Sequence, residues 1–113
     1  MSIKHKEMPL VLETYELDEV YIPWGRDKKI AKVIRITIHG KNIFQRALEP
    51  IIKVGDDIVQ FPEIQPDEQT IIGYLTKIPK EGAPITFGYG EKPQVQMKEL
   101  FKSSKIRKLS EPG

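Results

Sequence analysis

The residues best suited to acid–base or nucleophilic chemistry are few in this chain. It has two histidines, His5 and His39, and no cysteine. A histidine base needs a carboxylate to orient its imidazole, but the side chains expected beside His39 on its strand face, Arg35 and Thr37, are not carboxylates. All four serines lie near the ends of the sequence, where a rigid nucleophile is hard to position. They are Ser2, Ser103, Ser104 and Ser110. The sequence therefore predicts no catalytic residue and no enzyme.

Four carboxylate side chains in two expected loops could form a metal-binding site. Asp56 and Asp57 follow one strand-like run, and Asp67 and Glu68 precede another. Calcium prefers several hard oxygen ligands, so the two loops would have to meet to form a site. The residues lack the spacing of an EF-hand loop, and aspartate also favours turns for its own backbone hydrogen bonds. We interpret both pairs as turn residues and expect no metal ion and no cofactor.

Three aromatic residues, Tyr21, Trp24 and Tyr89, form the candidate surface for contact with a partner. An exposed aromatic cluster can stack on sugar rings or anchor a protein. Trp24 is the only tryptophan and lies between Pro23 and Gly25, which favours a loop or a strand edge. A single tryptophan in a small domain also commonly packs in the core or at its rim. The contact hypothesis requires the three rings to be exposed on one face, whereas the packing hypothesis requires them to be buried.

A basic stretch near the C-terminus is the second candidate surface. Residues 91–113 carry six basic and three acidic side chains, and the candidate basic patch consists of Lys98, Lys102, Lys105, Arg107 and Lys108. These cations, with Phe101 among them, could contact phosphates. The whole chain, however, has a net charge of only +2, which is too small to steer nucleic acid broadly. We interpret the stretch as a solvated tail, and nucleic-acid binding is disfavoured. That alternative would need a contiguous positive surface that also includes Lys28, Lys29, Lys32 and Arg35.

Length and composition predict one folded domain. The chain has 113 residues, of which 39% are hydrophobic and 30% are charged, a mixture that can form one core and stay soluble. No run approaches the roughly 20 apolar residues of a membrane span, and no export signal is visible. We therefore expect no membrane association and, by default, a cytoplasmic protein. The expected domain spans residues 1–97, followed by a basic tail at 98–113 that is partly helical or mobile.

Alternation of apolar and polar residues with a period of two predicts strands along most of the chain. The clearest run is 34–39, where three isoleucines share one face. The other expected strands are 10–17, 21–25, 50–54, 58–61, 70–76, 85–89 and 95–98. We expect Gly55, Asp56 and Asp57 to form a hairpin turn and Pro62 to end its second strand. Residues 42–48 and 98–109 are the two stretches with helical spacing.

Short strands separated by Gly and Pro, with no long helices between them, favour an antiparallel sandwich. Five segments then resemble the IPT/TIG family of immunoglobulin-like domains. They are ITIHGKNIF at 36–44, IKVGDD at 52–57, DEQTI at 67–71, IP at 78–79 and GAPITF at 82–87. The resemblance covers approximately residues 30 to 90. It implies an immunoglobulin-like β-sandwich of about seven strands and a non-enzymatic module. Because the family has no universal ligand site, it assigns no binding residue.

The sequence therefore predicts a non-catalytic interaction or structural module. It would bind another protein through a sheet edge or through the loops at one end, since a sandwich exposes both. A carbohydrate-binding accessory module is the first alternative, and weak nucleic-acid binding through the basic tail is the second. The identity of the protein partner and the oligomeric state are left open.

Overall fold

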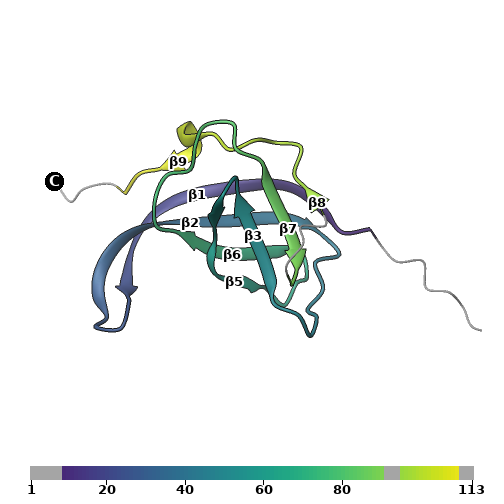
Figure 1. The fold of residues 1–113 in the computed structure, drawn as a ribbon, viewed down its shortest axis with the longest axis horizontal. Coiled ribbons are helices and arrows are strands. Elements are labelled where there is room, and N and C mark those ends of the chain that lie inside the picture. The colour runs from purple at the N-terminus through teal and green to yellow at the C-terminus, as the bar shows by residue number, and fades with distance from the viewer. Residues whose placement is uncertain (1–8, 91–94, 110–113) are drawn as a thin grey trace, which may run out of the picture.

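The computed structural model describes residues 9–90 and 95–109, and these form two β-sheets packed face to face (Figure 1). The strands are β1 (Val11–Trp24), β2 (Lys29–Lys41), β3 (Pro50–Val54), β4 (Asp57–Ile58), β5 (Gln60–Ile64), β6 (Thr70–Leu75), β7 (Ile85–Tyr89), β8 (Val95–Gln96) and β9 (Ile106–Arg107). One 3₁₀ turn, η1 (Ser103–Lys105), precedes β9. The described residues contain no helix that is long and apolar enough to cross a membrane.

The strand order is β5-β6-β2-β1-β9 in the five-stranded sheet and β4-β3-β7-β8 in the four-stranded sheet. All neighbours are antiparallel except β9, which runs parallel to β1 at Leu17 and Asp18. The all-β sandwich expected from the sequence is confirmed. The described residues form nine strands rather than about seven. Strands β4, β8 and β9 are pairings of two residues, too short to show a period of two.

The core lies between the sheets, where the alternation of the strands places their apolar residues. Ile36 and Ile38 point inward from β2 and are fully buried, and Ile85 and Phe87 do the same from β7. Burial of apolar surface of this kind stabilises the fold by about 25 cal/mol per Å². The turn at Gly55 is confirmed: Val54 pairs with Asp57 across it, and Gly55 has a φ of +64°.

The strand boundaries differ from the sequence prediction at several places. Residues 58–61 are not one strand, because Ile58 pairs with β3 in one sheet and Gln60 pairs with β6 in the other. Residues 10–17 and 21–25 are not separate strands, because β1 pairs continuously with β2 from Thr14 to Trp24. Pro62 does not end its strand, because β5 continues to Ile64. Strand β5 lies at the edge of its sheet and its pairing with β6 is irregular between Gln60 and Glu63. At an edge bulge a proline removes no necessary ladder hydrogen bond.

The two stretches with helical spacing are not α-helices. Residues 42–46 have no regular structure, and 47–48 form a bend. The segment 98–109 contains η1 and β9, and its Phe101 is fully buried in the core. The described part of the expected basic tail therefore packs on the sandwich. The strands expected at 85–89 and 95–98 pair with each other at Phe87 and Val95, and residues 91–94 between them lie outside the described residues.

A hydroxyl group in the core anchors this C-terminal segment. The Tyr15 hydroxyl donates a hydrogen bond to the Leu100 carbonyl at 2.9 Å and accepts one from the Lys102 amide at 2.9 Å. The Lys105 ammonium lies 3.8 Å from the centroid of the Tyr15 ring, close enough for a cation–π interaction. Burial raises the pKa of Tyr15. The helical spacing of 98–109 does not correspond to one buried face, because Phe101 is buried and Ile106 partly buried while Leu100 and Leu109 are exposed.

Candidate interaction surface

A two-stranded arm, residues 19–33, extends from the five-stranded sheet. It is the end of the β1–β2 hairpin and curves away at the lower left of Figure 1. The neighbouring strand β9 pairs with β1 only at Leu17 and Asp18, and β6 pairs with β2 only from Ile34 to His39. Both edges of the arm are therefore unpaired within the described residues. Unpaired strand edges present rows of backbone donors and acceptors to a partner.

The arm has one exposed apolar face. Tyr21 pairs with Lys32, and Pro23 pairs with Ile30, so the four side chains lie on one side of the hairpin. The residue exposures are 61% for Tyr21 and 65% for Ile30. These large apolar side chains stand beyond the sandwich, where no other sheet covers them. Residues of this type on an exposed surface are typical of a protein contact.

The opposite face of the arm packs against its own sheet through Trp24. The Trp24 ring centroid lies 5.3 Å from that of Phe61 and 6.1 Å from that of Tyr74, both in edge-to-face geometry. Val33, on the same face by alternation, is buried although it does not belong to the main core. Aromatic pairs of this kind contribute about 0.5–1.5 kcal/mol each beyond their buried area. This contact supports the curvature of the arm.

Phe61 is the residue that the sequence reasoning missed. It has a φ of +51°, a conformation that is rare for a bulky residue, and its exposure is 69%. Strained backbone at a bulky exposed residue often accompanies a functional surface. The single sequence signal was the adjacent Pro62, which favours a bulge rather than the strand end that we expected.

A surface groove of about 410 Å³ continues from Phe61 along the side of the sandwich, where strand β5 of one sheet faces β3 and β4 of the other. Its apolar lining includes Pro50, Ile51, Ile58 and Pro62. Because β5 pairs only with β6, its outer edge has no partner strand among the described residues, although the Gln45 side chain donates a hydrogen bond to the Ile64 carbonyl at the end of β5. The groove therefore combines an apolar floor with an open strand edge.

The structure does not bring the three candidate aromatic residues to one face. Tyr21 and Trp24 lie on opposite faces of the arm. Tyr89 lies on β7 in the other sheet and is buried; its hydroxyl donates a hydrogen bond to the Phe44 carbonyl, and Arg46 lies over its ring. The predicted contact surface of Tyr21, Trp24 and Tyr89 is therefore not formed, and Phe61 and Tyr74 take the places beside Trp24.

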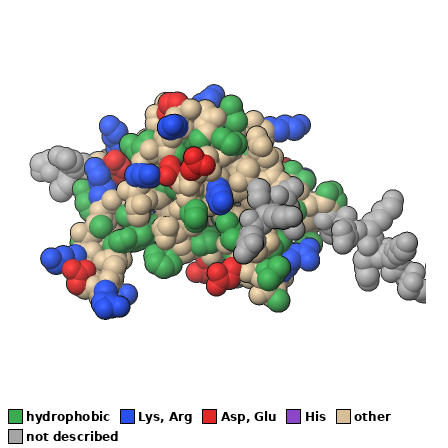
Figure 2. Space-filling view, in the orientation of Figure 1, with side chains coloured by type: hydrophobic (Ala, Val, Ile, Leu, Met, Phe, Trp, Pro, Cys, Tyr) green, Lys and Arg blue, Asp and Glu red, His purple; other side chains and the backbone are tan. Residues whose placement is uncertain are grey.

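The candidate basic residues are interleaved with carboxylates. Lys105 bonds Glu99 at 3.0 Å, and Arg107 lies 2.7 Å from Asp18 and 2.9 Å from Glu16. Lys98, Lys102 and Lys108 are exposed. The other cations considered for nucleic acid are paired in the same way, except Lys28: Lys29 with Asp27, Lys32 with Glu19, and Arg35 with Asp18, at 3.6–3.8 Å. Figure 2 shows blue and red side chains mixed on the visible face. This pattern is not a contiguous positive surface.

His39 has the carboxylate partner that the sequence did not indicate. Its Nε2 lies 2.6 Å from Glu16 Oε2, because β1 and β2 pair side by side and place the two residues on the outer face of the sheet. The other Glu16 oxygen accepts a hydrogen bond from Arg107, which also bonds Asp18. This network ties β9 to β1. His5, the other histidine, lies outside the described residues.

We expect Glu16 to make stability depend on pH. The hydrogen bond from His39, assisted by Arg107, holds the pKa of Glu16 below its ordinary value of 4.5. A carboxyl whose pKa is lowered on folding stabilises the fold above its unfolded pKa, and this contribution is lost as the pH falls through the folded pKa. The variant Glu16→Gln should therefore unfold at a lower temperature than the wild type at pH 7, and the difference should shrink below about pH 4.5.

Glu13 provides the matched control for this titration. Its side chain is 48% exposed, against 45% for Glu16, and it faces Lys41 at a longer 4.0 Å. Thermal unfolding of Glu13→Gln and Glu16→Gln across a pH series measures the effect. Equal pH profiles for the two variants would contradict the assigned role of the His39 hydrogen bond.

The four loop carboxylates do not come together. Asp57 pairs with Lys77 at 3.2 Å. Asp67 accepts hydrogen bonds from the Gln69 amide and the Thr70 hydroxyl at 2.9 Å, as an aspartate in a turn does, and these bonds lower its pKa. Residues 9–90 and 95–109 contain no group of three or more His, Cys, Asp or Glu side chains suited to a metal ion.

Comparison of the chain with protein-family models, curated proteins and solved structures finds no match. The resemblance to the IPT/TIG family gains no support from this comparison and stays a prediction.

Proposed function

We propose that this chain is a non-catalytic protein-interaction module and that the arm is its binding element. The observation that carries the proposal is the unpaired hairpin end, which exposes Tyr21 and Ile30 on one face and two strand edges beside them. An extended partner segment can add to such an edge through backbone hydrogen bonds, while side-chain contacts supply specificity. The sequence analysis also predicts a protein-interaction module, with a sheet edge as one of the two expected binding surfaces.

The two edges of the arm differ in their protection against pairing. The β2 edge carries Lys29 and Lys32, and exposed lysines hinder the approach of another strand. The β1 edge from Val20 to Trp24 has no charged residue. Pro23 removes one donor from this strand, but the remaining residues keep theirs. The β1 side is therefore the better edge for a partner.

A capture experiment with two paired variants tests the proposal. The immobilised chain is incubated with the native lysate, and retained proteins, glycans and nucleic acids are measured together. The variant Tyr21→Ser with Ile30→Ser should lose the retained protein. The control Leu48→Ser with Ile78→Ser changes two side chains that are equally exposed, 60% each, elsewhere on the surface, and it should keep the protein. The proposal would be contradicted if the arm variant retained as much protein as the wild type, or if only the control variant lost the retained protein.

Carbohydrate binding is the second candidate, and the exposed Phe61 ring favours it. Trp24 supports this ring from one side, and aromatic rings stack on the apolar faces of sugars. In the same capture experiment, a glycan signal that Phe61→Ala removes, and that Tyr21→Ser with Ile30→Ser leaves intact, would replace protein binding by carbohydrate binding.

A further inference from the structure

We infer that the partner of the arm is a second copy of this chain, and that the tip of one arm docks in the groove beside Phe61 of the next molecule. The inference rests on the proposed function, because it names the partner for the same arm. Three properties of the two surfaces match: their apolar side chains, their open strand edges and their charges.

The apolar surfaces are complementary in kind. The arm offers Tyr21 and Ile30, which are more than half exposed. The groove offers Ile58, Pro62 and the Phe61 ring, and it is lined mostly by apolar residues. Both surfaces also carry an open strand edge, that of β1 in the arm and that of β5 in the groove. Joining two such edges pairs backbone groups that would otherwise face solvent.

The charges make the match specific. Arg26 and Lys28 at the tip of the arm are exposed and have no ion pair among the described residues. Glu49 lines the groove and Glu63 follows Pro62 on β5; both are exposed and likewise unpaired in the described part of the chain. Two free cations thus face two free carboxylates when one molecule's tip enters another's groove. Such complementarity selects the partner and fixes its register.

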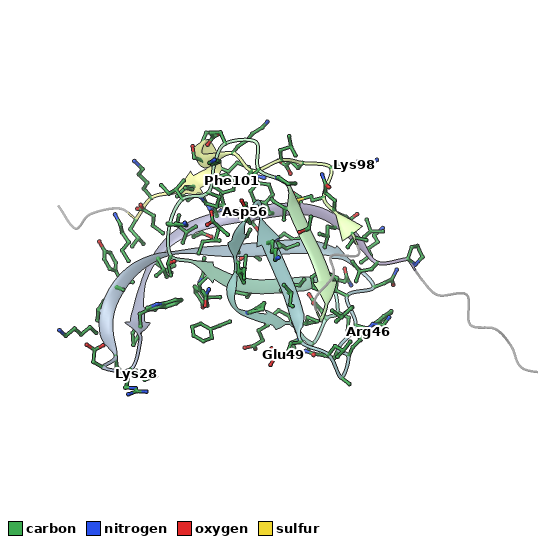
Figure 3. All side chains as sticks on the ribbon, in the orientation of Figure 1. Lys28, Arg46, Glu49, Asp56, Lys98 and Phe101 are labelled. Carbon is green, nitrogen blue, oxygen red and sulfur yellow. The ribbon has the colours of Figure 1, made fainter. Side chains whose placement is uncertain are left out.

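Within one molecule the arm reaches the groove only through Trp24, which packs on Phe61, and its charged tip lies away from Glu49. Figure 3 shows Lys28 at the tip of the arm and Glu49 at the lower edge of the sandwich, well apart and on different elements. Arg46, which is also labelled in Figure 3, lies 5.1 Å from the centroid of the Tyr89 ring and is directed to that ring. A contact between two different surfaces is heterologous, so it builds a ring or an open chain of subunits.

Sedimentation velocity on charge-reversed variants tests this arrangement. The wild type should grow in mass with concentration up to about 1 mM and should lose mass in high salt. The tip variant, Arg26→Glu with Lys28→Glu, and the groove variant, Glu49→Lys with Glu63→Lys, should each associate at least about tenfold more weakly. The control variant, Lys80→Glu with Lys98→Glu, makes the same charge change as the tip variant outside both surfaces and should assemble like the wild type.

Mixing the variants gives the sharpest result. The groove variant keeps a native tip that fits the native groove of the tip variant, and the reversed tip of the tip variant fits the reversed groove of the groove variant. The mixture should therefore assemble again, in species that alternate the two variants, although each variant alone stays dissociated. The chain with all four reversals should assemble again by itself. A wild type that stays monomeric, or a mixture that stays monomeric while the wild type assembles, overturns the inference. If the chain does not self-associate but still captures a different protein through the arm, the self-association inference fails and the proposed function stands. If the chain neither self-associates nor captures any protein through the arm, the inference and the proposed function both fail.

Discussion

Replacing Phe101 by alanine is expected to lower the free energy of unfolding by about 3–5 kcal/mol, the usual cost of removing a fully buried phenylalanine. The ring is fully buried between the sheets, and the backbone of Phe101 is hydrogen-bonded to Gly82 and Ala83, so the surroundings cannot close the cavity easily. A domain of this size has a total stability of only about 5–15 kcal/mol. Denaturant unfolding followed by the fluorescence of Trp24 measures the loss.

The neighbouring Leu100 provides the control for this substitution. Its side chain is exposed, while its carbonyl accepts the Tyr15 hydrogen bond and is unaffected by a change of side chain. Leu100→Ala should therefore cost well under about 1 kcal/mol. If Phe101→Ala were as mild, residues 98–109 would be a tail that does not contribute to the core. A chain truncated after Met97 would lose the core residue Phe101 together with the basic side chains of the segment. Its behaviour would therefore not isolate the effect of the charge.

Replacing Gly40 by alanine is the second change with a large expected effect, a loss of about 3 kcal/mol or more in unfolding free energy. A Cβ atom at Gly40 would lie 2.1 Å from the Val11 carbonyl oxygen, which belongs to the backbone of the adjacent strand. The strands pair irregularly at this point, with the register shifting between Leu12 and Thr14. Relief of the clash requires β1 to move away from β2, which breaks pairing. Thermal unfolding measures the effect.

Gly73 distinguishes a backbone clash from a side-chain clash. A Cβ there would lie 2.3 Å from Cγ1 of Val59, a side-chain atom. Adding Val59→Ala to Gly73→Ala should therefore recover part of the lost stability. Adding Ile43→Ala to Gly40→Ala removes only the 3.1 Å contact with the Ile43 side chain and should recover little. If Gly40→Ala with Ile43→Ala regained the full stability of the wild type, the backbones of β1 and β2 would not approach as closely at Gly40 as the structure shows.

The candidate site shows where sequence reasoning failed. Trp24 was expected to lie with Tyr21 and Tyr89, but the rings beside it are those of Phe61 and Tyr74, from strands about 40 and 50 residues further along the chain. Tyr89 has the same residue type as Tyr21 and a similar local pattern, yet it points into the core. Local pattern gives the alternation of a strand but not which sheet it joins, so it could not tell these two tyrosines apart.

The partner of His39 was missed for the same reason. Glu16 and His39 are 23 residues apart and meet only because the β1–β2 hairpin has one particular register. A shift of one residue would turn every side chain of a strand to the other face. The register of two paired strands depends on all the residues that point into the core, and the local sequence pattern does not determine it.

The all-β class, the turn at Gly55 and the inward face of 34–39 follow from local sequence, because they depend on the period of a strand and on residues that favour turns. The other features depend on contacts within the folded chain. Burial of Phe101 made a structural segment out of an expected tail, and the long pairing of β1 with β2 made an arm out of two expected strands. These outcomes depend on contacts between residues far apart in the chain, whose energies do not appear in any local pattern.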